Sequence, residues 1–236
     1  AAASVTYAAS APTALADTVA APARASVTYA SAAPTITVVL PFSFVGALIA
    51  NGAANTVTWP SGTAAGDLAI ICAVLTAPTW SNLSGWTQDV NGEVIDGGGG
   101  VARAYIYSKV LTSGDVATPA SYTGLTNGGH CVAVYRGGTA ITEKGSTAAD
   151  AGTDCAVTGF TKNGACKGVI GLLVDRDPTS NITAPSGFAE DIEGAITFFD
   201  FHVASVGASG YADNAAVTWT TLAASFGQFA IIYEAT

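Results

Sequence analysis

The sequence predicts an all-β protein: a duplicated antiparallel β-sandwich, jelly-roll-like, preceded by an extended N-terminal arm. Three observations predict this fold. Runs of about five to nine residues rich in Val, Ile, Thr, Tyr and Phe are separated by Gly, Pro, Asn, Asp and Ser. The same order of runs occurs twice along the chain. Helical signals are scarce, because the many alanines lie among β-branched residues and glycines.

The repeat is clearest in "LSGWTQDV" at 83–90, which returns as "PSGFAEDI" at 185–192. The similarity extends in both directions, so that 56–75 aligns with 156–175 and 128–137 aligns with 226–235. The alignment also pairs aromatic residues: Tyr105 and Tyr107 with Phe199 and Phe201, and Tyr135 with Tyr233. The matching "SG-aromatic" segments therefore indicate equivalent corners in two halves of one sandwich.

Residues 41–236 are expected to form a single domain. Its two halves, at about 44–137 and 145–236, each contain about four strand-like runs, and four short strands bury too little apolar area to be stable alone. We therefore expect the strands of the two halves to interleave. Two independent small domains in tandem are the alternative. The apolar run at 36–50 is interrupted by Pro41 and Gly46, so it predicts a pair of buried strands and not a membrane helix.

Residues 1–40 have a repeat of their own, since "ASVTYAASAPT" at 3–13 returns as "ASVTYASAAPT" at 25–35. Composition alone indicates a low-complexity linker. However, both copies place the same β-type residues at the same positions: Val5 and Tyr7 in the first, Val27 and Tyr29 in the second. A repeated Val-Thr-Tyr suits a strand that pairs with the sheet edge of another subunit. We therefore predict an extended assembly arm.

The charge balance excludes some partners and favours others. The net charge is −9 with eight scattered Lys and Arg residues, which argues against binding to a nucleic-acid backbone. Charged residues make up only 11% of the chain, against about 25% in typical globular proteins. Such a surface favours contacts with other chains, including copies of itself. The four cysteines are expected to be reduced, because buried Cys behaves as a small hydrophobic residue.

The sequence predicts no enzyme and no cofactor. His130 and His202 have no metal-ligand spacing around them, and no G-x-S-x-G motif is present. Acidic residues cluster after each "SG-aromatic" segment: Asp89, Glu93 and Asp96 in the first half, and Glu190, Asp191 and Glu193 in the second. Their matching positions indicate a solvated loop edge. A paired-carboxylate glycosidase site and a weak calcium loop that adds Asn91 are the alternatives. Trp80 and Trp86 are the candidate glycan contacts.

Several segments together resemble a β-sandwich module of bacteriophage virion proteins, of the kinds labelled minor tail or capsid-decoration proteins. They are "TWPSGTAAGDLAIICAVL", "SGWTQD", "YIYSKVLTSGD" and "VAVYRG", and the resemblance covers about residues 44–236. The second half departs from the pattern, with Cys166-Lys167 in place of Gly66-Asp67. The family has no active site to transfer to this chain.

This resemblance implies a non-enzymatic structural protein of a virus particle. Its partners would be other virion subunits and copies of itself, with no nucleic acid and no membrane. It would assemble in the host cytoplasm and become extracellular with the virion. The alternative is a carbohydrate-binding adhesin or receptor-binding tip that uses Trp80 and Trp86.

Overall fold

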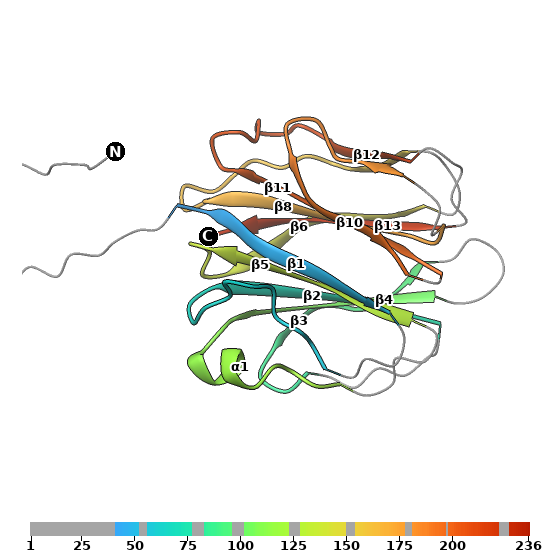
Figure 1. Cartoon of the computed structure of the whole chain (residues 1–236). Coiled ribbons are helices and arrows are strands. Elements are labelled where there is room, and N and C mark those ends of the chain that lie inside the picture. Colours follow the sequence, from blue (N-terminus) through green and yellow to red (C-terminus); the bar gives the residue numbers. More distant parts are fainter. Residues whose placement is uncertain are drawn as a thin grey trace, which may run out of the picture. The chain divides into compact units, whose positions relative to one another are not determined.

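A computed structural model describes residues 41–51, 56–76, 83–95, 102–122, 128–149, 154–177, 181–196, 198–221 and 227–236. The residues from Val38 to Thr236 form one compact unit. The regular secondary structure of its described part is nearly all strand, with one five-residue helix, and every strand pair in it is antiparallel (Figure 1). Among the described residues, no helix is long and apolar enough to span a membrane.

The first half of the repeat supplies one five-stranded sheet in the order β1-β5-β2-β4-β3. Its strands are β1 (Ser43–Asn51), β2 (Leu68–Leu75), β3 (Thr87–Ile95), β4 (Ala102–Val110) and β5 (Gly128–Arg136). The helix α1 (Ser113–Ala117) follows β4.

The second half supplies a second five-stranded sheet in the order β10-β11-β8-β13-β6. Its strands are β6 (Ile141–Ala149), β8 (Gly168–Asp175), β10 (Ala189–Ala195), β11 (Asp200–Gly207) and β13 (Gln228–Ala235). A third, three-stranded sheet in the order β7-β12-β9 comes from the same half. It consists of β7 (Asp154–Val157), β9 (Ile182–Thr183) and β12 (Val217–Thr221).

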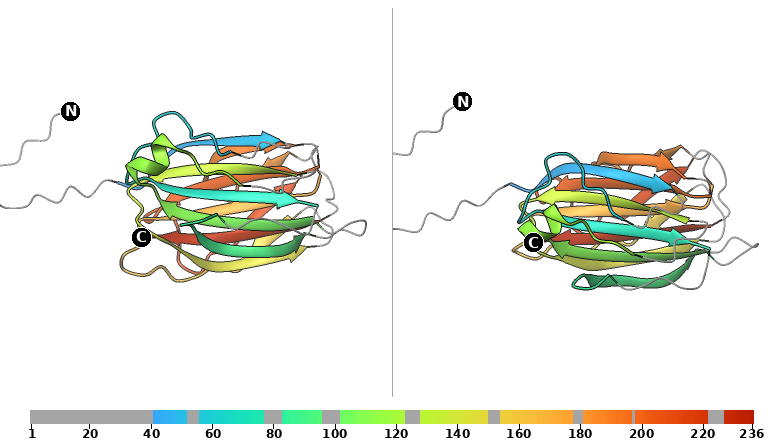
Figure 2. Two further views of the ribbon diagram at one scale, coloured as in Figure 1. Left: turned by 90° about the horizontal axis from the view of Figure 1, so that it is seen from below. Right: turned by 60° about the horizontal axis from the view of Figure 1, so that its bottom comes forward.

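The prediction of a duplicated all-β sandwich is confirmed, but its halves do not interleave as we expected. In chain order, the strands β1 to β5 of the first sheet correspond to β6, β8, β10, β11 and β13 of the second. With this correspondence, the strands lie in the same order in both sheets. Each half thus forms one whole sheet, and the two sheets pack face to face (Figure 2). Interleaving is unnecessary because each sheet has five strands, and the opposite sheet covers its inner face.

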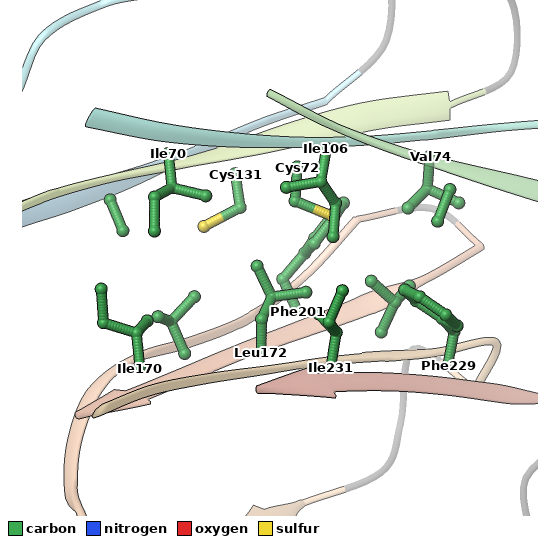
Figure 3. Packing of buried hydrophobic residues seen from close by; sticks show 14 of the residues in the cluster. Ile70, Cys72, Val74, Ile106, Cys131, Ile170, Leu172, Phe201, Phe229 and Ile231 are labelled. Carbon is green, nitrogen blue, oxygen red and sulfur yellow. The ribbon is translucent and has the colours of Figure 1, made fainter. Parts of the chain in front are cut away.

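Strands β2, β5, β8 and β13 are buried along nearly their whole length, because both faces of each sheet are covered. The even-numbered residues from Leu68 to Val74 point into the core between the sheets, where they meet Ile170, Leu172 and Val174 of β8 (Figure 3). The odd-numbered residues from Ala69 to Leu75 point to the opposite face of β2. This alternation follows from the two-residue period of a strand, and both sets are apolar, as in a strand buried on both faces.

Each outer face is covered by a segment of its own half. On the first sheet, Val57, Leu111 and Tyr122 pack over β2 and β5. On the second sheet, the small sheet β7-β12-β9 supplies the cover, and Trp219 of β12 is completely buried. Three separate hydrophobic clusters result, one between the two large sheets and one on each outside.

The register of the strands corrects the aromatic pairings that the sequence alignment suggested. In the first sheet, β2 pairs with residues 128–135 of β5. In the second sheet, the equivalent strand β8 pairs with residues 228–235 of β13. Tyr135 therefore corresponds to Ala235 and not to Tyr233. Tyr107 pairs with Ile71 and lies on an outer face, whereas Phe201 pairs with Val174 and lies in the central core. An odd shift in register moves a side chain to the other face of a sheet, which residue type alone does not indicate.

Two local features also differ from the expectation. Gly46 does not interrupt the apolar run but lies within β1, where a Cβ atom would come within 2.7 Å of the Pro60 ring. Helix α1 was not predicted, although "TSGD" at 112–115 has capping-box spacing. Thr112 accepts a hydrogen bond from the backbone N–H of Asp115, and the Asp115 carboxylate accepts one from the N–H of Thr112.

Candidate functional site

The tryptophan expected to contact a glycan is partly covered by a second tryptophan. Trp86 lies immediately before β3, and its ring stacks on Trp59 with centroids 6.2 Å apart and an interplanar angle of 16°. The Trp59 indole N–H donates a hydrogen bond of 2.8 Å to the backbone oxygen of Asp115. The pair therefore packs against the outer cluster of the first sheet. Trp80 lies outside the described residues.

The two acidic clusters do not form a solvated loop edge, so this expectation is wrong. Glu93 lies in β3 and Glu190 lies in β10, which are edge strands of opposite sheets. Strand β3 has a register shift at Asp89, and strand β10 has one at Asp191. A β-bulge changes the direction of the side chain at the extra residue. Asp96 of the proposed calcium loop lies outside the described residues.

Asp191 turns into the sandwich and joins the two sheets. The hydroxyl of Tyr135, on β5 of the first sheet, donates a hydrogen bond of 2.7 Å to Asp191 Oδ2 on β10 of the second. Burial raises the pKa of Asp191 to about 6, while hydrogen bonds from Ser205 and Tyr135 oppose the rise. This bond fixes the position of one sheet relative to the other.

The corresponding carboxyl of the first half, Asp89, lacks such a bond. Burial raises the pKa of Asp89 to about 6, and a hydrogen bond from Ser108 opposes the rise. Its Oδ2 atom and the hydroxyl of Tyr233 are both buried without a hydrogen-bond partner. Burial, followed by the negative charge of Asp89, raises the pKa of Tyr233 well above its usual value. Because Tyr233 is two residues out of register with Tyr135, the two contacts are not equivalent.

The largest group of buried polar side chains lies between the second sheet and its small outer sheet. It comprises Asp175 of β8, Asp200 and His202 of β11, Thr221 of β12 and Gln228 of β13, with the half-buried Glu193 of β10 beside them. The strand register brings these residues together, since Asp175 pairs with both Asp200 and Gln228. Sequence reasoning missed this cluster. The available signal was that Leu75 and Gly128 of the first half correspond to Asp175 and Gln228.

Hydrogen bonds hold most of this cluster in place. Gln228 Nε2 donates to Asp175 Oδ2 at 3.3 Å, and the backbone N–H of Ile182 donates to Glu193 Oε1 at 2.6 Å. Three atoms remain buried without a hydrogen-bond partner: Asp200 Oδ1, His202 Nε2 and Gln228 Oε1. Burial, followed by the nearby carboxylates of Glu193 and Asp175, raises the pKa of Asp200 to about 7, while hydrogen bonds from the backbone of Phe201 and Gly194 oppose the rise.

His202 is neutral in this environment. Burial lowers its pKa to about 4, although the charge of Glu193 opposes this shift. The Trp219 indole N–H donates to Nδ1 at 3.2 Å, so the ring proton lies on Nε2. Glu190 Oε2 is 3.5 Å from that nitrogen, but with a neutral ring this contact is not an ion pair at pH 7. His130 in the first half is similar, because burial lowers its pKa to about 4 and a ring nitrogen shares a hydrogen bond with Tyr122.

Some of these polar groups stabilise the fold and others destabilise it. They do not form a metal centre. Within the described ranges, no three His, Cys, Asp or Glu side chains are placed to hold a metal ion. The cluster has a side chain from each of five strands and is covered by the small outer sheet. Its effect is on stability, because a buried carboxyl beside two others favours its protonated form.

The cysteines and the departure in the repeat have structural roles. All four cysteines are free thiols, as predicted. Cys72 of β2 and Cys131 of β5 lie opposite each other in the strand register.

In the first half, Arg136 binds the buried carboxylate of Asp67 through two hydrogen bonds of 2.9 Å. In the second half, Lys167 instead donates a hydrogen bond of 2.8 Å to the backbone oxygen of Gly137.

The predicted assembly residues, Val5, Tyr7, Val27 and Tyr29, lie outside the described part of the chain. The surface of that part has few large exposed apolar side chains, namely Leu48, Val94, Val110 and Phe198. Searches for related proteins identify no family model, no curated protein and no solved structure that matches this chain.

Proposed function

We propose that this chain is a non-enzymatic structural subunit of a virus particle, of the capsid-decoration or minor tail kind. It would join the particle through its N-terminal arm, and its partners would be other virion subunits and copies of itself. The resemblance of residues 44–236 to phage virion modules supports the viral setting. The low fraction of charged residues and the duplicated sandwich are consistent with it.

The observation that carries the proposal is that the sandwich covers its own sheets while the arm repeats a strand-like motif. Both faces of both sheets are packed by residues between Phe42 and Ala235. The described residues thus pack these sheets by themselves, and we infer another role for the motif at 3–13 and 25–35. A near-identical repeat of a strand-like motif is then best explained by contacts with other chains.

The groups with perturbed pKa values also favour a structural role over catalysis. Asp200 is buried within the second half, whereas the half-buried Asp191 binds Tyr135 between the two large sheets, so each carboxyl has its own structural surroundings. Structural networks perturb pKa values just as catalytic sites do. The carboxyls that a glycosidase would use are distributed over β3 and β10, at the edges of different sheets.

The test uses the virus-producing culture and two forms of the chain. The full-length chain should co-purify with particles through a density gradient, at a constant number of copies per particle measured by quantitative mass spectrometry. A chain lacking residues 1–35 should have the same melting transition but be absent from the particles. A full-length chain found only outside the particles would contradict the proposal, and so would normal incorporation of the truncated chain.

The carbohydrate-binding alternative depends on Trp80 and Trp86. Stacking against Trp59 occupies one face of the Trp86 ring, which leaves less of this ring for a sugar. Saturable binding on a glycan array that is lost in Trp86→Ala would support this alternative instead.

A further inference from the structure

Strand β1 is an edge strand with a regular, uncharged run. In the part of the chain that the structure describes, β5 is the only strand that pairs with β1. From Gly46 to Asn51 the pairing continues without a register shift. None of the nine residues of β1 is fully buried, and Leu48 is 39% exposed. An edge strand of this kind has unpaired backbone N–H and C=O groups that another strand can use.

The other edge strands of the two large sheets carry charged residues, which β1 lacks, whereas β1 shares with them a register shift, between Phe44 and Gly46. Strand β3 has two register shifts and the carboxylates of Asp89 and Glu93. Strand β6 has one register shift and the charged residues Glu143 and Lys144. Strand β10 has one register shift and three carboxylates. Bulges and charges of this kind oppose the addition of a further strand. Strand β6 is the counterpart of β1 in the repeat, so only one of these two equivalent edges is open.

The arm contains a segment that fits this edge. Ser-Val-Thr-Tyr occurs at residues 4–7 and again at 26–29, with a β-branched pair and an aromatic residue and no charge. An uncharged edge and an uncharged strand pair without burying an ion. We propose that the edge of β1 at residues 46–50 binds the Ser-Val-Thr-Tyr segment of the arm of a second copy, as a sixth strand of the first sheet. This inference rests on the proposed function, in which the arm makes the assembly contacts.

The sequence between the arm and β1 favours a neighbouring copy over the same chain. Residues 30–42 read "ASAAPTITVVLPF", with no Gly, Asn or Asp. These are the residues that tight hairpin turns use most. Pro34 and Pro41 instead favour extended chain at the residues that precede them. A tight turn that would fold the arm back along its own β1 therefore has no support in this sequence.

The spacing of the two motif copies allows one arm to bind two neighbours. The copies are 22 residues apart in the sequence, a distance of up to about 70 Å in extended chain. A nine-residue strand such as β1 is only about 30 Å long. Of the four edge strands of the two large sheets, only β1 accepts a further strand in this arrangement. Because each arm has two motifs, the arms can link sandwiches into a continuous assembly.

The test places a lysine at this edge in the full-length chain. Leu48→Lys adds a charge to β1, and Val94→Lys is the matched control, because Val94 is 37% exposed on the edge strand β3. Sedimentation velocity should show concentration-dependent association for the wild type and for Val94→Lys. Leu48→Lys should weaken the association by about tenfold or more, since a charge on an edge strand opposes pairing. Circular dichroism and melting curves of both variants check that the fold is kept.

Two further measurements identify the occupant. A synthetic peptide of residues 1–35 should compete with self-association and protect the backbone amides of residues 46–50 from hydrogen exchange. A peptide in which both tyrosines and both valines of the motifs are replaced by Asp should do neither. If β1 amides are protected in a full-length chain that remains monomeric, the arm binds its own sandwich and the inference is overturned.

The outcomes separate this inference from the proposed function. If removal of residues 1–35 abolishes association but Leu48→Lys behaves like Val94→Lys, the arm acts at another surface. The inference then fails while the proposed function is retained. If the chain without residues 1–35 associates and enters particles normally, the proposed function itself fails. Loss of association in both the truncated chain and Leu48→Lys, with Val94→Lys unaffected, supports both.

Discussion

Replacing Asp200 by Asn should stabilise the protein at alkaline pH, and the size of the effect follows from its surroundings. Asp200 is 3% exposed, its Oδ1 has no hydrogen-bond partner, and the carboxylates of Glu193 and Asp175 are near it. Its pKa is about 7 in the fold, against 3.8 as the reference value for an Asp side chain. The raised pKa means that this group contributes stability at low pH, which is lost as the pH rises through about 7.

The expected magnitude can be worked from these two pKa values. Between about pH 4.5 and pH 8, a carboxyl that changes from 3.8 in the unfolded chain to about 7 in the fold costs about 3 kcal/mol of stability. Asn has nearly the same shape and cannot ionise, so Asp200→Asn removes this cost. The difference in free energy of unfolding between the variant and the wild type should therefore be about 3 kcal/mol larger at pH 8 than at pH 4.5. This corresponds to about 6 to 12 °C in Tm.

The assay is urea unfolding of both proteins at three pH values, followed by tryptophan fluorescence. Subtracting the wild-type free energy of unfolding from that of the variant at each pH cancels the other groups that titrate, including His130 and His202. Asp154→Asn, at an exposed position on β7, controls for the loss of one negative charge. If the difference between Asp200→Asn and the wild type stays constant from pH 4.5 to pH 8, Asp200 is not a buried carboxyl with a raised pKa, and the reasoning is refuted.

Two further predictions use matched pairs of variants. Tyr135→Phe removes the 2.7 Å hydrogen bond to the β10 carboxylate and should cost about 1 to 3 kcal/mol in urea unfolding, whereas Tyr233→Phe, which removes a buried hydroxyl without a partner, should be neutral or stabilising. Equal costs for both would contradict the contrast between the two halves. Gly171→Ala places a Cβ atom 2.6 Å from the Trp219 ring and should lower stability by about 1 to 3 kcal/mol, while Gly164→Ala meets no atom within 4 Å and should change it little. A stable Gly171→Ala would show that the small outer sheet can move away.

The sequence was sufficient to predict the class of the fold, because strand-length apolar runs and turn residues are local properties. The duplication was also visible, since two copies of one segment conserve spacing and residue type. It led to the correct all-β sandwich. The free cysteines were predicted separately, because buried Cys behaves as a small hydrophobic residue. The uncharged character of β1 is readable as well, because "GALIAN" at 46–51 has no charge and no proline.

Only the tertiary structure decided how the halves combine and which face each side chain occupies. Whether two sets of strands interleave or form separate sheets depends on long-range pairing, which residue composition does not encode locally. Tyr107 and Phe201 look equivalent in the alignment, yet their registers place them on opposite faces of corresponding strands. Asp89 and Asp191 read as solvated acids, but the bulges in β3 and β10 accompany their burial. The polar cluster around Asp200 exists because β8, β11 and β13 pair in one register, and that register is a property of the whole sheet.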